Sequence, residues 1–248
     1  MSELLAHRGF SRKYPENTLL AVKSALELGA CNIEVDVHLS KDQVPVVIHD
    51  ARLQRTCAVE GEVHALPYEQ LAQISAHYPQ KFGDNFLPEP IPSLSQLVEL
   101  IQLWPQSTVF VEIKRACINH FGIDVVLQRV LPEIEPILSR CVLISFDPQV
   151  PRLARHFGAN RVGWVFEGWS QEAKQTAAQL QVDFLLTDYT MVPHGEILWP
   201  GPWQWVLYAV DETDVAVHWL EQGAHIIETN DIELLLACKP LGRSACNE

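Results

Sequence analysis

The sequence predicts an α/β fold, a TIM (β/α)8 barrel that spans residues 1–248 as one domain, with a small insertion after the second strand. Short apolar runs alternate with segments of helical periodicity along the whole chain, which is typical of a parallel sheet with crossover helices. Residues 51–92 interrupt this alternation and form the insertion. With 248 residues, 48% of them hydrophobic, the chain can fill a core of this size.

Nine apolar runs are strand candidates, one more than a closed barrel of eight needs. The run at 44–48 follows the run at 32–37 across the turn-like sequence SKDQ, so we interpret the two as a hairpin or as one extended strand. An open doubly wound sheet is the alternative, which is weakened because no G-x-G-x-x-G follows the first run. The nine runs are residues 4–6, 32–37, 44–48, 108–113, 141–146, 161–166, 183–187, 205–210 and 225–229.

Helices are expected between most of these runs, for example at residues 16–30, 93–104, 171–181 and 211–224. We expect the first helix to begin at Glu16, just after Pro15, and to end at Gly29. Proline is favoured at the start of a helix and glycine just beyond its end.

The insertion at residues 51–92 is rich in proline, lacks strong periodicity and is too short to indicate a separate domain. Its aromatic residues Tyr68, Tyr78, Phe82 and Phe86 suit a compact cap over one end of the barrel. A structural plug is the alternative interpretation.

The amino-acid composition and the N-terminal sequence limit the partners that we expect the protein to bind and its expected location in the cell. Lys and Arg number 18 against 31 Asp and Glu, a formal charge of −13 that argues against nucleic acid and acidic membrane surfaces as general partners. The N-terminus, MSELLAHRGF, does not resemble a signal peptide, and no apolar run reaches the ~18–20 residues of a membrane span. The six cysteines have no metal-binding spacing, so we expect them to be reduced in a cytoplasmic protein without stable membrane insertion. The oligomeric state is not determined by the sequence.

The run at 32–37 carries two carboxylates, Glu34 and Asp36, although its other residues are those of a buried strand. Residues two apart on a strand point the same way, so both acids face one side, where they repel each other and lose hydration. A nearby cation would make this arrangement tolerable.

Polar residues also occur at three other early strands. His7 and Arg8 follow the first run, His49 and Asp50 follow the third, and Glu112 lies in the fourth with Lys114 just beyond it. The carboxyl ends of barrel strands meet on one face, where active sites lie.

Taken one at a time, each of these clusters also has a structural explanation, such as an edge-strand face or an ion pair. Their coincidence at four strand ends favours function. We therefore predict one divalent-cation site on Glu34, Asp36 and Glu112 with space for an anionic ligand. For His38, His64, His120 and His225 we favour a structural role.

These segments resemble the compact bacterial cytoplasmic type of the glycerophosphodiester phosphodiesterase family. The resemblance rests on AHRGFSRKYPENT (6–18), IEVDVHLSKDQVPVVIHD (33–50), IPSLSQ (91–96), VEIK (111–114) and ISF (144–146), and it covers nearly the whole chain. Each motif alone is weak, but their order and spacing are specific.

The resemblance implies a TIM barrel with an insertion after the second strand and roles for seven residues. His7 and His49 would be the acid/base pair, Glu34, Asp36 and Glu112 the ligands of one divalent cation, Mg²⁺ or Ca²⁺, and Arg8 and Lys114 the phosphate contacts. The substrate would be a small glycerophosphodiester such as glycerophosphocholine or glycerophosphoethanolamine, hydrolysed to sn-glycerol 3-phosphate and an alcohol. The residues alone do not choose between a cyclic phosphate intermediate and direct attack by water.

Two departures from the family pattern occur near the C-terminal strands. The family usually has an aromatic-Thr-Val-Asn run where this chain has Tyr208-Ala209-Val210-Asp211, so Tyr208 is a possible pocket residue. The family's Thr-Asp turn is replaced by Thr229-Asn230 within ETND.

Two alternative functions are a lipase-type phosphodiesterase acting on lysophospholipids or sphingolipids, and a catalytically inactive binding barrel.

Overall fold

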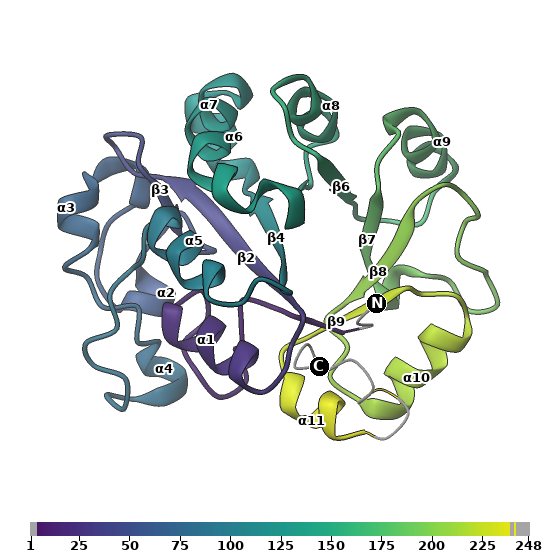
Figure 1. Ribbon diagram of the computed structural model, residues 1–248, viewed down its shortest axis with the longest axis horizontal. Helices are drawn as coiled ribbons and strands as arrows, with labels where there is room; N and C mark the ends of the chain where they lie inside the picture. Colours follow the sequence, from purple (N-terminus) through teal and green to yellow (C-terminus); the bar gives the residue numbers. More distant parts are fainter. Residues whose placement is uncertain (1–3, 239–240, 242–248) are drawn as a thin grey trace.

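The computed structural model describes residues 4–238 and Leu241, and it confirms the predicted TIM barrel. Eight parallel strands close on themselves, because β1 pairs with both β9 and β2, so the open doubly wound alternative is wrong. Figure 1 shows the strands at the centre of the molecule and helices around them. The barrel strands are β1 (Leu4–Ala6), β2 (Asn32–Leu39), β4 (Thr108–Ile113), β5 (Cys141–Ser145), β6 (Arg161–Val165), β7 (Phe184–Asp188), β8 (Gln204–Tyr208) and β9 (Ile226–Thr229).

The extra strand, β3 (Pro45–Val47), forms the predicted hairpin with β2. It runs antiparallel to β2, with Val47 opposite Val37. Because β3 runs back along β2, the Ile48 N–H donates to the Asp36 carbonyl at 3.0 Å, and His49 and Asp50 follow beside the part of β2 that carries Glu34 and Asp36.

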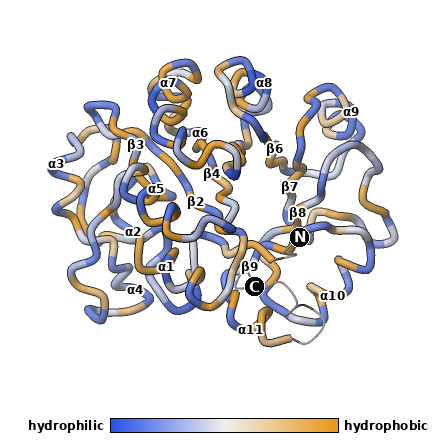
Figure 2. Tube along the Cα trace, viewed as in Figure 1, coloured by the Kyte–Doolittle hydropathy of each residue, from blue (hydrophilic) through white to orange (hydrophobic). Residues whose placement is uncertain are grey.

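Helices cover the outside of the barrel, and each alternates hydrophilic and hydrophobic residues (Figure 2). Alternation of this kind lets one face of a helix pack on the sheet while the other meets solvent. The helices are α1 (Leu19–Glu27), α5 (Leu94–Gln102), α6 (Arg115–Phe121), α7 (Ile123–Ile134), α8 (Gln149–His156), α9 (Gln171–Leu180), α10 (Thr213–Glu221) and α11 (Ile232–Ala237), with 3-10 turns η2 (Glu135–Arg140) and η3 (Tyr189–Met191).

The expected start of the first helix is wrong by three residues. Helix α1 begins at Leu19, because the Thr18 hydroxyl caps it by accepting a hydrogen bond from the backbone N–H of Ala21 at 3.1 Å. Glu16 lies before the helix and forms an ion pair with Arg8 instead. The predicted end is confirmed, since Gly29 follows the last turn with a φ of 100°.

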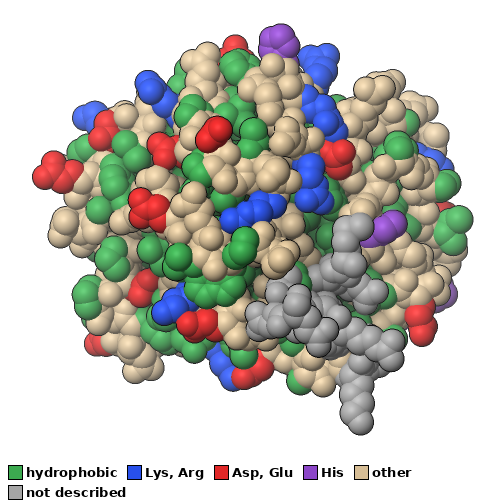
Figure 3. All heavy atoms as spheres, viewed as in Figure 1, with side chains coloured by type: hydrophobic (Ala, Val, Ile, Leu, Met, Phe, Trp, Pro, Cys, Tyr) green, Lys and Arg blue, Asp and Glu red, His purple; other side chains and the backbone are tan. Residues whose placement is uncertain are grey.

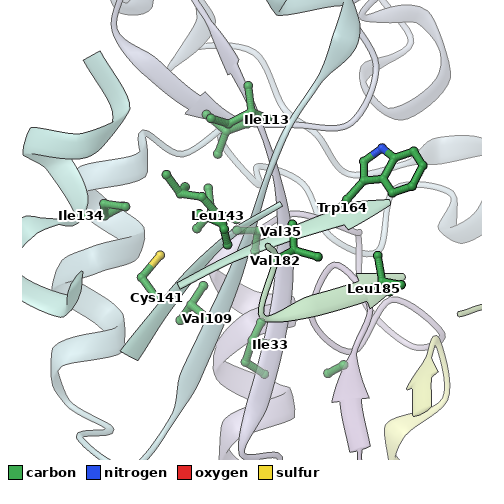
Figure 4. Packing of buried hydrophobic residues seen from close by; sticks show 14 of the residues in the cluster. Ile33, Val35, Val109, Ile113, Ile134, Cys141, Leu143, Trp164, Val182 and Leu185 are labelled. Atoms are coloured by element: carbon green, nitrogen blue, oxygen red, sulfur yellow. The ribbon is translucent and has the colours of Figure 1, made fainter. Parts of the chain in front are cut away.

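The two faces of each strand have different neighbours. Ile33 and Val35 of β2 point toward the helices, in the layer shown in Figure 4. Inside the barrel, Phe110 of β4 lies level with Glu34, and Glu112 lies level with Asp36. The carboxylates therefore lie on the inner face. The apolar layer of the interior consists of Leu5, Phe110, Val142, Ile144, Val165, Phe184, Leu186, Val206 and Ile226.

The insertion lies at one side of the barrel, at the left of Figure 1. It contains α2 (Gln54–Cys57), η1 (Val63–Ala65), α3 (Tyr68–Leu71) and α4 (Pro79–Phe82). A small hydrophobic cluster of its own, which includes Leu53, Val63 and Leu71, joins it to β3. The segment is thus ordered and packed.

The cysteine prediction is only partly correct. Cys57, Cys117, Cys141 and Cys238 are free thiols, but Cys31 is in a disulfide bond, so the expectation of six reduced cysteines is wrong at Cys31. Cys246 lies outside the described residues.

Two features are relevant to possible partners: the distribution of charge on the surface and the length and apolarity of the helices. In the view of Figure 3, Lys and Arg side chains are interspersed with Asp and Glu. Within the described part of the chain, no helix combines the length and apolarity that crossing a bilayer would require.

The interior apolar layer gives a stability prediction. Phe110 is fully buried and packs edge-to-face on Phe184, with ring centroids 5.0 Å apart. Phe110→Ala should lower the free energy of unfolding by about 3–5 kcal/mol through lost burial and a new cavity. Leu103→Ala is the matched control, because Leu103 is 72% exposed and its change should stay within about 0.5 kcal/mol. Equal losses in urea denaturation would contradict this assignment of the core.

Candidate active site

Three buried carboxylates form the floor of the barrel mouth. Glu34 and Asp36 lie on β2 and Glu112 on the neighbouring β4, with exposures of 2%, 1% and 8%. One oxygen from each lies within 4.8 Å of the others. The sequence prediction that these three residues converge is therefore confirmed.

Two cationic side chains partly offset this negative charge. The Lys114 ammonium lies 3.1 Å from Asp36 Oδ1 and 2.6 Å from Glu112 Oε1. Arg8 Nε lies 3.1 Å from Asp36 Oδ2, and the Arg8 backbone N–H donates to Glu34 Oε2 at 3.0 Å. Burial alone would raise the pKa of Asp36, but the charges of Lys114 and Arg8 hold it well below its usual value.

Glu34 remains the least compensated of the three. Burial, followed by the charges of Asp36 and Glu228, raises its pKa well above the usual value. Its Oε1 atom is buried and has no hydrogen-bond partner among residues 4–238 and Leu241. An unpartnered carboxylate oxygen beside two further carboxylates fits a hard divalent cation, which prefers oxygen ligands.

The residues of the sequence motifs around Arg8 each have a structural role. Arg8 and Gly9 both have positive φ, 55° and 77°, which turns the chain sharply after β1. A Cβ on Gly9 would lie 2.6 Å from the backbone of Ala21, so only glycine fits. Asn17, from the PENT sequence, donates to Asp36 Oδ2 at 2.7 Å and accepts from the Asp36 N–H at 3.0 Å. This pair of hydrogen bonds holds Asp36 in place.

His7 is oriented by two successive hydrogen bonds. Its Nδ1–H donates to the amide oxygen of Asn230 at 2.9 Å, and the Asn230 amide in turn donates to Asp211 at 3.1 Å. Because an amide oxygen only accepts, His7 Nε2 carries the lone pair, and this atom lies 4.0 Å from Glu34. Burial and the nearby Arg8 charge lower the pKa of His7 to about 4, so the ring is neutral at pH 7.

The Asn230–Asp211 contact links two of the residues that depart from the family pattern, although it does not explain Ala209. The carboxylate stands at 211 and the amide at 230, and the two side chains bond to each other. Relative to the family pattern, exchanging the two residues together keeps the hydrogen bond between them. The group next to His7 is then a neutral amide and no longer a charged carboxylate.

His49 is oriented by the residue that follows it. Its Nδ1–H donates to Asp50, which leaves Nε2 free. Arg55 of the insertion donates to the other Asp50 oxygen at 2.6 Å and also to Glu16 at 2.7 Å. Glu16 further contacts Arg8 at 2.6 Å. This network connects the insertion to His49, through Asp50, and to Arg8, through Glu16.

The predicted residues other than Asp36 line one pocket of about 220 Å³. The lining combines these charged residues and both histidines with a mostly apolar part that includes Phe146 and Ala209, and Tyr208 also lies at this pocket. Within the described part of the chain, this lining contains no residue of 51–92.

Sequence reasoning missed several contributors. Glu228 of β9 lines the pocket, and burial followed by the charge of Glu112 raises its pKa to about 8. A charged residue inside the apolar run IIET was the available signal. The hydrogen bond between Asn230 and His7 and the Glu16–Arg55 pair gave no local signal, because the partners lie far apart in sequence.

Comparisons with known proteins agree with this geometry. The sequence model of the glycerophosphoryl diester phosphodiesterase family matches residues 7–119. A glycerophosphodiester phosphodiesterase from Caldanaerobacter subterraneus is 31% identical over 246 residues, covering 94% of this chain and 96% of that protein. Another from Bacillus altitudinis is 36% identical over 148 residues, which are 59% of this chain and 58% of that protein.

Solved structures share the barrel. A phosphodiesterase from Oleispira antarctica, in complex with its product sn-glycerol-3-phosphate, superposes with a TM-score of 0.83 at 19% identity and covers 96% of both chains. A glycerophosphodiester phosphodiesterase from Parabacteroides distasonis has a TM-score of 0.77 at 20% identity, covering 97% of both. Because the Caldanaerobacter relative is similar along almost the whole chain, the protein belongs to the glycerophosphodiester phosphodiesterase family of phosphoric diester hydrolases.

Proposed function

We propose that the enzyme hydrolyses small glycerophosphodiesters to sn-glycerol 3-phosphate and an alcohol, using one divalent cation and the pair His7 and His49. The observation that supports this best is the pairing of the two histidines across one pocket. Each has its Nδ1–H held by an acceptor, and the pocket floor is made of carboxylates. The product bound to the Oleispira phosphodiesterase is consistent with the proposed product.

Glu34, Asp36 and Glu112 would hold the cation, which is Mg²⁺ or Ca²⁺. When bound, it supplies positive charge that neutralises the phosphodiester and the developing charge at the reacting phosphorus. Arg8 and Lys114 line the same pocket and would contact the non-bridging oxygens. Because both already face carboxylates, they are fixed in position before the substrate arrives.

The histidines would move the protons. One neutral imidazole accepts a proton from the nucleophile at its Nε2, and the other, protonated, donates one to the leaving alkoxide oxygen. The nucleophile is either the neighbouring substrate hydroxyl or water. Asn230 and Asp50 keep each ring in the tautomer that presents Nε2 to the pocket.

The direct test is a substrate panel of glycerophosphocholine, glycerophosphoethanolamine and the matching lysophospholipids. We expect turnover of the deacylated compounds only, with glycerol 3-phosphate and free choline or ethanolamine as products. The apolar part of the lining, with Tyr208 and Ala209, offers few polar contacts to the head group, so the rates should differ by less than about a hundredfold, or 2.7 kcal/mol. Turnover confined to acylated substrates, or release of choline phosphate, would contradict the proposal.

A pair of variants separates the cation from proton transfer. Glu34→Gln should lose divalent-ion affinity and turnover together, because Glu34 Oε1 is a buried carboxylate oxygen without a hydrogen-bond partner among the described residues. His49→Ala should keep the ion but lose about 10²–10⁴-fold in kcat, the usual contribution of a general acid or base. Affinity is measured by calorimetry with Mg²⁺ and Ca²⁺. If His49→Ala abolished ion binding, His49 would be a ligand and the division of roles would be wrong.

A second pair tests the orientation of His7. Exchanging the two side chains in the double variant Asp211→Asn, Asn230→Asp preserves their hydrogen bond but places a carboxylate on His7 Nδ1. That charge stabilises the protonated ring and raises its pKa above the present value of about 4. Because the base must be neutral, the acid limb of the kcat/KM profile should move to higher pH. Asn230→Ala should instead lower kcat by about 10–100-fold. An unmoved limb in the double variant would exclude His7 as the titrating base.

The role of the insertion is a further part of the proposal. We infer that residues 51–92 act as a cap beside the glycerol end. Its seating supports this, because Lys81 donates to the Ser11 carbonyl at 2.6 Å and Phe86 packs on Tyr14 with ring centroids 5.7 Å apart. Lys81→Ala should raise KM while ion affinity stays unchanged, and Lys23→Ala on α1 is the matched control. Identical KM values for both would support a structural plug instead.

A cytoplasmic location stays a prediction, to be checked by cell fractionation.

A further inference from the structure

A second group of metal-type side chains lies beside the active site and takes no part in the proposed reaction. His38 comes from β2, His64 from η1 of the insertion, and Cys117 and His120 from α6. The sequence suggests a separate structural role for each histidine, but the fold brings all three together with a free thiol.

The donor atoms of this group converge on one point. His38 Nδ1 lies 2.9 Å from His64 Nε2, and one ring nitrogen of each histidine and the Cys117 sulfur all lie within 4.8 Å of one another. His38 and Cys117 are fully buried and His64 is 7% exposed. A tetrahedral zinc site has metal–nitrogen distances of about 2.0–2.1 Å and a metal–sulfur distance of about 2.3 Å, so only small shifts of the side chains are needed.

The tautomer of His38 is already the one that a metal requires. Its Nε2 lies 3.0 Å from the backbone carbonyl oxygen of His49, which only accepts, so Nε2 carries the hydrogen. Nδ1 therefore directs its lone pair toward His64. A histidine ligand that donates its other N–H to a backbone carbonyl is the usual arrangement at metal sites.

A fourth donor is within reach. Cys117 and His120 are three residues apart on α6, so they lie on the same side of that helix. The His120 ring lies on the side of His64, with ring centroids 4.8 Å apart, and it is exposed to solvent. His120 therefore lies at the solvent-exposed side of the three-residue group and is the candidate for a fourth ligand after a rotation of its side chain.

We propose that His38, His64 and Cys117, with His120 as the fourth ligand, form a second metal site that takes a zinc-type ion. Imidazole and thiolate ligands favour Zn²⁺ over the Mg²⁺ and Ca²⁺ that an all-oxygen site selects. The site joins η1 and α6 to the strand that carries Asp36, and through His38 it fixes the carbonyl of His49. It does not depend on the function proposed above.

Ion binding would release one proton. Burial raises the pKa of the Cys117 thiol to about 12, so without metal the sulfur carries a hydrogen. When the sulfur–metal bond forms, that proton passes to solvent. The hydrogen bond between His64 and His38 is replaced by two nitrogen–metal bonds, and the His64 proton moves from Nε2 to Nδ1.

Co²⁺ titration of the chelator-treated full-length protein tests the proposal, because cobalt bound to thiolate gives a near-ultraviolet charge-transfer band that an all-oxygen site does not give. The titration uses the Glu34→Gln variant, which lacks the proposed catalytic cation site. We expect one equivalent of Co²⁺ with this band, displaced by Zn²⁺. Cys117→Ser should lose the band, whereas Cys141→Ser, which changes another buried free thiol, should keep it.

His64→Gln provides a second test if Cys117→Ser does not fold, as judged by circular dichroism. Loss of this ligand should weaken Co²⁺ binding by at least about tenfold. A protein without the band, or a band that persists in Cys117→Ser, would show that the group is only a hydrogen-bonded cluster and would overturn the proposal. Unchanged affinity in His64→Gln would do the same.

Discussion

The repulsion among Glu34, Asp36 and Glu112 is the constraint on which the rest of the site depends. These carboxylates lie buried on two paired strands, and Lys114 and Arg8 partly offset their charge. Burial penalises each ionised carboxylate, and their proximity adds to that penalty. The divalent cation proposed above would relieve both effects at once, so that a carboxylate cluster that is costly in the free protein would suit a reaction at an anionic phosphodiester.

The neighbouring structure holds this charged cluster in one geometry. The sharp turn at Arg8 and Gly9 directs a backbone N–H at Glu34, and Asn17 holds Asp36 with two hydrogen bonds. Glu16 and Arg55 then link the turn to the insertion and to Asp50. His7, which follows β1, and His49, which follows β3, line the same pocket as this cluster. The contacts Arg8–Glu34, Asn17–Asp36 and Glu16–Arg55 join residues 26, 19 and 39 positions apart in sequence, so the site forms only when the barrel closes.

Local sequence patterns were sufficient to predict the barrel strands and the residues that strand periodicity places on one face. The two-residue spacing of Glu34 and Asp36 predicts that they share a face, and the register confirms it. The start of α1 was misplaced because Pro15 gives a local signal, whereas the Thr18 cap and the pairing of Glu16 with Arg8 decide the boundary. The Asn230–Asp211 pair and the group around His38 were missed because each requires knowledge of which distant segments pack together.

Thermal unfolding at pH 7 tests most directly whether a cation makes the carboxylate cluster tolerable. The wild-type protein and Glu34→Gln are compared after chelation and again with excess Mg²⁺ or Ca²⁺. Removing one buried charge should raise the Tm of the chelated protein, while the increase that the ion gives the wild type should disappear in the variant. A chelated variant that melts below the wild type and gains equally from the ion would contradict the account.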